Sequence, residues 1–173
     1  MIRSATAADA AELARVAAIT FPLACPPHVT DAAKAAFIAG TLSEARFAEY
    51  LDDDQRVLLV AEIDSAVSGY AMLVLGDPSD ADVAAAISLR PTAELSKFYL
   101  MPETHGSGLA TELMAASIAA AREQEALGLW LGVNQENARA NRFYEKHGFT
   151  LVGTKRFLVG DRLEHDFVRE LPL

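Results

Sequence analysis

Hydrophobic and polar positions follow two different periods along this chain, one typical of helices and one typical of strands. A short apolar strand is predicted at residues 2–5. Thr6 then begins a helix, because apolar residues recur at three- and four-residue steps over residues 13–20 and so share one helical face. Three closely spaced prolines interrupt this pattern and predict a loop over residues 21–28.

Further along, apolar and β-branched runs predict the strands of a sheet. Thr30 and Ser43 first begin two more helices, since both residue types cap helix N-termini. Residues 56–63 and 67–75 are strand-like runs that a turn at residues 65–66 makes antiparallel partners. The remaining predicted elements are an excursion of unassigned structure at 77–91, a strand at 93–101, an Ala-rich helix at 107–125, a strand at 127–134, a helix at 137–147, a strand at 149–154 and a last hairpin over 157–169 that turns near 160–161.

The element order is therefore β, helices, β, β, β, α, β, α, β, β. Mixed order of this kind predicts an α/β fold (mixed α+β) with one central sheet and helices on both faces. The chain has no internal repeat and no linker long enough to divide it. We therefore expect residues 1–173 to form a single domain.

Composition and charge narrow the possible partners. The chain has 173 residues, of which 51% are hydrophobic and 23% charged, as in a globular protein. A net charge of −9 argues against nucleic-acid binding, which needs a cationic surface. It favours a cationic substrate, although an acidic surface that only maintains solubility is the simpler alternative. No apolar run approaches the roughly 18–20 residues of a membrane span. With no apolar leader at the start and one cysteine, Cys25, the expectation is a cytoplasmic protein.

A glycine-bearing turn follows the strand at 93–101. Pro102 stops the strand, and Gly106 and Gly108 precede the long helix. Glycine lets the backbone approach a ligand closely, and the unpaired N–H groups of a helix N-terminus attract phosphate. The turn is not a dinucleotide fingerprint, because Thr111 stands where the third glycine would be. A pyrophosphate site is one interpretation, and a plain loop-to-helix junction is the other.

A second motif lies between residues 129 and 149. An apolar strand leads into a helix that Asn137 caps and that Gly148 ends. Asn137, Ala140 and Tyr144 share one face of this helix, because three- and four-residue steps bring side chains together. Taken alone, Tyr144 is better explained as a half-buried scaffold residue.

Together the two motifs resemble those of the GNAT superfamily of N-acetyltransferases. The family pattern Gln/Arg-x-x-Gly-x-Gly/Ala is similar to residues 105–110, and Asn-x-x-Ala-x-x-Phe-Tyr-x-x-x-Gly-Phe is matched at every specified place by residues 137–149. Within the superfamily the chain looks most like bacterial spermidine/spermine acetyltransferases of the PaiA type. The resemblance implies a mostly antiparallel mixed sheet that splays at the cofactor site, acetyl-CoA as co-substrate, and a small-molecule amine, such as a polyamine, as acceptor.

The resemblance also implies roles for individual residues. Tyr144 would protonate the departing CoA thiolate as general acid. His105 replaces the Gln/Arg of the family pattern, and a neutral imidazole still donates one hydrogen bond; an exposed histidine without phosphate contact is the alternative. The residues expected to bind acetyl-CoA are Phe98, Tyr99, Leu100, His105, Gly106, Ser107, Gly108, Leu109, Ala110, Thr111, Asn137 and Tyr144.

The acceptor amine must lose a proton, since an alkyl amine of pKa about 10.4 is neutral in only about one part in a thousand at pH 7. Some family members carry a glutamate base at the position of Gly132. Glu94 is the best substitute, although it could be an ordinary strand-end carboxylate. Cys25 and His28 are not expected to form a nucleophile pair, and no metal site is expected. Other acids that could receive a polyamine are Glu49, Asp52, Asp53, Asp54, Asp161 and Glu164.

Two other functions stay open at this point. The first is a non-catalytic acetyl-CoA sensor, which the changed His105 and the missing base at Gly132 favour. The second is a protein lysine or N-terminal acetyltransferase, which would need a groove open to a peptide. Dimerisation is common in the resembling family, so a homodimer is a further alternative.

Overall fold

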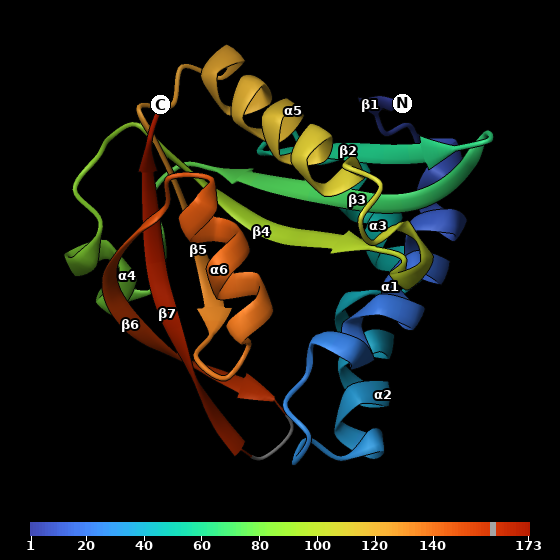
Figure 1. Cartoon of the computed structure of the whole chain (residues 1–173), viewed down its shortest axis with the longest axis horizontal. Coiled ribbons are helices and arrows are strands. Elements are labelled where there is room, and N and C mark those ends of the chain that lie inside the picture. The colour runs from blue at the N-terminus through green and yellow to red at the C-terminus, as the bar shows by residue number, and fades with distance from the viewer. Residues whose placement is uncertain (160–161) are drawn as a thin grey trace.

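The computed structural model describes residues 1–159 and 162–173, and within them seven strands form one sheet (Figure 1). The strands are β1 (Ile2–Ser4), β2 (Arg56–Ile63), β3 (Ala66–Leu75), β4 (Thr92–Leu100), β5 (Gly128–Asn134), β6 (Thr150–Val159) and β7 (Arg162–Pro172). Their order across the sheet is β1-β2-β3-β4-β5-β7-β6. Of the neighbouring pairs, β4 and β5 run parallel and the others antiparallel. This is the mixed, mostly antiparallel sheet that was expected.

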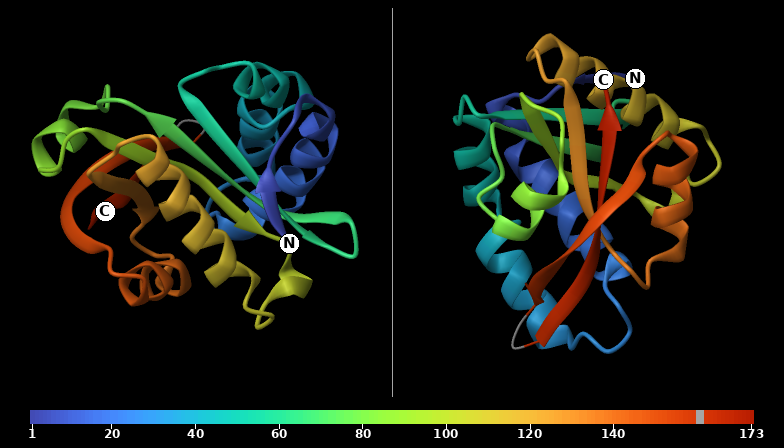
Figure 2. Two further views of the ribbon diagram at one scale, coloured as in Figure 1. Left: turned by 90° about the horizontal axis from the view of Figure 1, so that it is seen from above. Right: turned by 90° about the vertical axis from the view of Figure 1, so that its left-hand side faces the viewer.

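Helices cover both faces of the sheet (Figure 2). One face carries α5 and α6, and the other carries the helices that precede β2. The helices are α1 (Ala10–Ala24), α2 (Asp31–Thr41), α3 (Glu44–Leu51), α4 (Ala81–Ala86), α5 (Leu109–Glu123) and α6 (Ala138–Lys146), with short 3-10 turns η1 (Ala7–Asp9) and η2 (Pro102–Thr104). None of the helices in the described ranges is long and apolar enough to cross a membrane.

The continuous apolar run of β2 follows from this two-sided burial. Leu59 and Ala61 pack in the core beneath α5, whereas Leu58 and Val60 pack in the core beneath α1 and α3. Alternate residues of a strand point to opposite faces, so a strand covered on both sides is apolar at every position. The turn to β3 lies at Asp64 and Ser65, both with positive φ, one residue earlier than predicted.

The predicted loop over residues 21–28 is wrong at its start, because α1 continues through Pro22 to Ala24. Proline removes one backbone hydrogen bond and crowds the carbonyl four residues earlier, and only two residues of α1 follow Pro22. Phe21 compensates by burial, since it is only 6% exposed and stacks on Phe37 with 4.5 Å between ring centroids. The excursion at 77–91 also contains α4, which Asp80 caps, and β6 runs five residues beyond the predicted strand end. The predicted turn at 160–161 lies outside the described residues.

The sheet opens between its two parallel strands. Strands β4 and β5 pair only at Thr92–Gly128, Ala93–Leu129 and Glu94–Trp130, and then they diverge (Figure 1). A register shift opposite Met72 and Leu73 bends β4 just beyond this point. On its other edge β5 pairs with β7 along its whole length, from Gly128 opposite Pro172 to Asn134 opposite Asp166. A wedge is thereby built into the middle of the sheet.

Candidate active site

Two adjoining cavities occupy the wedge. The glycine-loop cavity, of about 260 Å³, lies between the end of β4, the turn before α5 and helix α6. The hairpin cavity, of about 390 Å³, lies between β4, β5, the β6–β7 hairpin and the chain that follows α1. Six residues line both cavities and mark where they meet: Ala24, Phe98, Tyr99, Asn137, Ala140 and Tyr144.

The glycine turn has the geometry of an anion cradle. Gly106 and Gly108 have φ of +86° and +89°, and a Cβ at either position would meet no atom within 4 Å. The open space at both glycines lets a ligand reach the backbone at the start of α5, where N–H groups and the helix dipole favour negative charge. Ser107 stiffens the turn, because its Oγ donates to the Thr104 carbonyl oxygen at 2.7 Å and accepts from Leu109 N at 3.3 Å.

Most of the predicted cofactor-binding residues lie together around the glycine-loop cavity. Those that line it are Phe98, Tyr99, Leu100, His105, Gly106, Gly108, Ala110, Asn137 and Tyr144. The other three have different surroundings: Ser107 bonds within the turn, Leu109 is buried in the core beneath α5, and Thr111 is exposed on α5.

His105 stands beside a cation that the sequence analysis did not single out. Arg139 Nη1 lies 3.2 Å from His105 Nδ1. Because a guanidinium only donates, the imidazole Nδ1 accepts and its proton is on Nε2. Partial burial, and then the charge of Arg139, lower the pKa of His105 below its usual value. The loop therefore carries a neutral imidazole and an adjacent permanent positive charge, both at the mouth of the glycine-loop cavity.

Helix α6 is fastened to the sheet by a buried polar network. Asn141 donates from Nδ2 to the carbonyl oxygens of Asn134 and Asn137, at 3.0 and 2.9 Å. Its Oδ1 accepts from Nε of Arg169 on β7 at 3.0 Å, and Arg169 Nη2 pairs with Glu145 at 2.7 Å. Asn141 and Arg169 are 8% and 3% exposed. Because these bonds join α6 to both β5 and β7, they fix the helix that carries Tyr144.

Tyr144 lies at the junction of the two cavities. Its ring packs edge-on against Phe98, Phe143 and Phe149, with centroids 5.6–6.4 Å away. Burial raises the pKa of its phenol well above the usual value. The hydroxyl therefore keeps its proton at neutral pH and is suited to donate it to a group that becomes negative.

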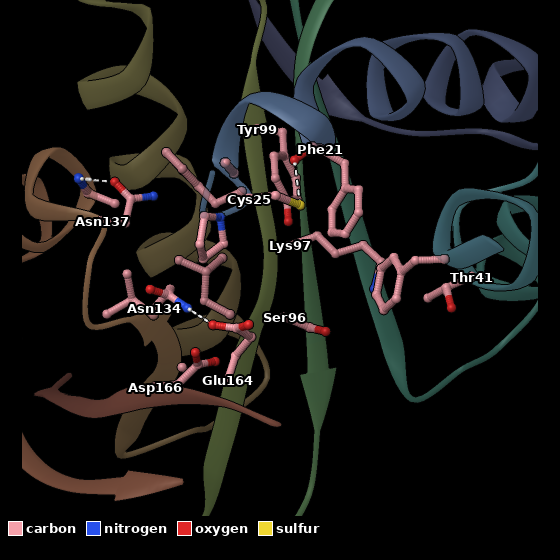
Figure 3. Close-up of a pocket in the computed structure, with 18 of the residues that line it drawn as sticks. Phe21, Cys25, Thr41, Ser96, Lys97, Tyr99, Asn134, Asn137, Glu164 and Asp166 are labelled. Atoms are coloured by element: carbon pink, nitrogen blue, oxygen red, sulfur yellow. Dashed lines mark hydrogen bonds between the residues drawn. The ribbon is translucent and has the colours of Figure 1, made fainter. Parts of the chain in front are cut away.

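The hairpin cavity gathers charges of both signs (Figure 3). Glu94 on β4 and Asp166 on β7 are carboxylates whose pKa values burial raises, that of Asp166 to about 6. Burial lowers the pKa of Lys97 to about 8. In Figure 3, Asp166 and Glu164 lie close together, whereas Lys97 extends towards Phe21 on the opposite side. Lys155 on β6 completes the charged lining.

A hydrogen bond closes one side of the hairpin cavity. His28, in the loop after α1, lies with Nε2 at 2.6 Å from Oε1 of Glu164 on β7. The other oxygen of Glu164 accepts from Asn134 Nδ2 at 3.4 Å. Cys25 in the same loop bonds the Phe21 carbonyl oxygen at 3.4 Å, and burial raises the pKa of its thiol. The Cys25 thiol is therefore protonated and donates to a backbone oxygen, which does not activate it as a nucleophile.

The acids predicted near the end of α3 lie away from both cavities. Glu49 pairs with Arg46 at 2.6 Å and Asp53 with Arg56 at 2.8 Å, and neither these two acids nor Asp52 and Asp54 line a cavity. Of the predicted acids, the structure brings Glu94 and Glu164 to the hairpin cavity, and Asp161 lies outside the described residues. Within the described ranges no group of three or more His, Cys, Asp or Glu side chains could hold a metal ion.

Comparisons with known proteins agree with this geometry. The sequence profile described as "Acetyltransferase (GNAT) family" matches residues 26–149. An uncharacterized N-acetyltransferase of Mycobacterium tuberculosis is 52% identical over 165 residues, which cover 94% of this chain and 98% of that protein.

Solved structures share the fold over the whole chain. The PaiA N-acetyltransferase from Thermoplasma acidophilum in complex with coenzyme A has a TM-score of 0.78 at 21% identity, and the match covers 100% of this chain and 98% of that one. Ribosomal-protein-alanine N-acetyltransferase from Brucella melitensis has a TM-score of 0.72 at 24% identity, with 100% and 99% covered. The family match includes both the glycine turn and the Asn137–Tyr144 helix face. The chain therefore belongs to the GNAT family and is an N-acetyltransferase whose co-substrate is acetyl-CoA.

Proposed function

We propose that this enzyme transfers the acetyl group directly to a primary amine of a small molecule while both substrates are bound. The observation that carries the proposal is the position of Tyr144, which lines both cavities at their junction. The glycine-loop cavity takes the CoA moiety, and the hairpin cavity takes the acceptor. Tyr144 is then the general acid that gives its proton to the leaving thiolate.

The chain offers several groups to acetyl-CoA. The cradle at Gly106 and Gly108 accepts the diphosphate, since both positions leave room for a ligand against the backbone. Strand β4 turns away from β5 before Phe98 to Leu100, so the backbone of this edge is free to hydrogen-bond the pantetheine arm. One N–H group of the same β4 segment polarises the thioester carbonyl. Asn137 uses Oδ1 to cap α6, so Nδ2 is the atom it presents to the pantetheine arm.

Arg139 is expected to take part in binding the acetyl-CoA phosphates. Replacing it by Gln should weaken acetyl-CoA binding by about 5- to 20-fold, the value of one charge-assisted contact. Calorimetric titration at two salt concentrations measures this, because loss of a cation also reduces the salt dependence. Exposed Arg142 on the same helix is the matched control, and an equal effect of Arg142→Gln would contradict a specific role for Arg139.

For the acceptor we propose a polyamine as the leading candidate. Three carboxylates line the hairpin cavity against two ammonium groups, and the chain carries a net charge of −9. Both favour a substrate with more than one positive charge. The contact between His28 and Glu164 narrows the cavity on one side, which favours a small molecule over a peptide chain.

Thiol release tests this function. The enzyme is incubated with acetyl-CoA and a panel that contains spermidine, spermine, amino acids and a lysine peptide. We expect release of free CoA with at least one polyamine and identification of the acetylated amine by mass. Turnover of the lysine peptide alone would favour a protein acetyltransferase. Tight acetyl-CoA binding without turnover of any amine would favour the sensor.

We also propose that residues 1–173 act as one N-acetyltransferase domain in the cytoplasm. The two larger hydrophobic cores pack on one shared sheet, and the thiol of Cys25 is free. A free thiol suits a reducing compartment. A homodimer remains an alternative that the mass in solution decides.

A further inference from the structure

The position that carries a glutamate base in some GNAT enzymes is Gly132 here, and the structure shows what stands in its place. A Cβ at Gly132 would lie 2.6 Å from Lys155 Cε and 3.2 Å from Lys155 Nζ. It would lie 3.4 Å from Oδ2 of Asp166. Lys155 thus fills the space that a side chain at Gly132 would enter, and a carboxylate from the neighbouring strand reaches the same place.

Strand register explains how Asp166 arrives there. Asp166 on β7 pairs with Asn134 on one side and with Lys155 of β6 on the other. Asn134 is the last residue of β5, at the open end of the wedge, three residues before the Asn137 cap of α6. The β7 strand therefore brings a carboxylate to the hairpin cavity, which β4 lines as well.

The surroundings of Asp166 suit a proton acceptor. The residue is 8% exposed and lines the hairpin cavity. Burial raises its pKa to about 6; Lys155 and His165 oppose this rise, and Glu164 adds to it. Burial, and then Tyr144, Cys25 and Asp166, raise the pKa of the Tyr99 phenol on β4. A carboxylate of this kind is mostly ionised at pH 7 and more basic than an exposed one.

Glu94 has a less favourable position. It pairs with Trp130 in the last rung before β4 and β5 part, at the closed end of the wedge. Along the strand it is five residues from Tyr99, or about 16 Å at the usual rise per residue. Asp166, by contrast, lies beyond the point where β4 and β5 part, opposite Asn134 at the end of β5.

We propose that Asp166 is the general base of this enzyme and takes the place of the glutamate missing at Gly132. This inference rests on the proposed function. The acceptor ammonium gives one proton to the Asp166 carboxylate, and the neutral amine attacks the thioester carbonyl carbon. As the C–N bond forms and the C–S bond breaks, the thiolate takes the Tyr144 proton. The nitrogen then loses a second proton to become the amide, and this proton passes through solvent to the Tyr144 phenolate. Asp166 releases its own proton to water.

The pH dependence of Asp166→Asn tests the inference. The rate constant kcat/KM is measured from pH 5.5 to 10 with acetyl-CoA saturating and with spermidine, or with the fastest amine of the panel if another reacts faster. The unchanged enzyme should rise to a plateau above pH 6 to 7. The variant should be on the order of 10²–10³-fold slower at pH 7. It should recover about tenfold per pH unit towards pH 10, because it depends on amine that is already neutral.

Three comparisons separate a base from a structural role. Asp166→Glu should regain part of the plateau, and acetyl-CoA affinity and melting temperature should stay near those of the unchanged enzyme in both variants. Exposed Asp31→Asn makes the same chemical change elsewhere and should leave the profile intact. A loss that is equal at every pH, or a plateau that disappears in Glu94→Gln and persists in Asp166→Asn, overturns the assignment. If the unchanged enzyme releases no thiol with any amine, the proposed function itself fails.

Discussion

Replacing Tyr144 by Phe is expected to lower kcat on the order of 10²–10⁴-fold. The phenol is held at the junction of the two cavities, and burial raises its pKa, so it holds a proton that a leaving thiolate can take. A free thiol has a pKa of about 8.5, so a departing thiolate depends only moderately on protonation by an acid. A loss of kcat of about 10²-fold is therefore the smallest loss expected. Single-turnover thiol release measures the effect.

Acetyl-CoA binding separates the chemical role of Tyr144 from a packing role. The phenylalanine keeps the ring contacts with Phe98 and Phe149, so the Kd for acetyl-CoA should change by less than about threefold. Tyr50→Phe is the matched control, because its hydroxyl bonds the Thr41 carbonyl oxygen and lines neither cavity. An unchanged kcat and pH profile in Tyr144→Phe would remove the acid role.

Replacing Asn141 by Ala is expected to destabilise the protein by about 2–4 kcal/mol. The change leaves the carbonyl oxygens of Asn134 and Asn137 without their shared donor, and it leaves Nε of the buried Arg169 without its acceptor. For a chain of this size the melting temperature should fall by about 4–14 °C. Calorimetric or circular-dichroism melting measures this fall.

The control for Asn141 lies on the same helix. Arg142→Ala removes an exposed side chain and should cost less than about 0.5 kcal/mol. If Asn141→Ala melts within about 1 °C of the unchanged protein, the network does not hold α6 in place. In that event the position of Tyr144 depends on ring packing alone.

How much of the site could be predicted from the sequence depends on how far apart its residues lie in the chain. The glycine turn and the Asn137–Tyr144 helix face are local motifs, so each could be recognised from spacing and residue type. The resemblance to the GNAT superfamily implied that both bind one cofactor, and the structure brings them to one cavity. Asp166 and Lys155 reach Gly132 only through the pairing of β5, β6 and β7, and no local pattern encodes that register. The one sequence signal for this carboxylate was that Glu164 and Asp166 lie two residues apart, on the same side of a predicted strand. The apolar residues Phe167 and Val168 follow them directly.

Predictions from residue type alone failed where tertiary packing outweighed it. Pro22 is normally a helix breaker, but burial of Phe21 against Phe37 carries α1 past it. The sequence analysis did not single out Arg139, because only the fold places it beside His105. The fold class was predictable, because the order of elements and their two-sided hydrophobic patterns constrain the layers.

The place of β7 in the sheet has a consequence for how the enzyme is made. It lies between β5 and β6, although it is the last of the seven strands in sequence order, and β5 pairs with β4 at three positions. While residues 162–172 are still inside the ribosome, the nascent chain therefore lacks the strand that joins β5 to β6. The glycine turn of the cleft can form before then, whereas α6, which Arg169 on β7 fastens, and the acceptor half must wait until translation passes these residues.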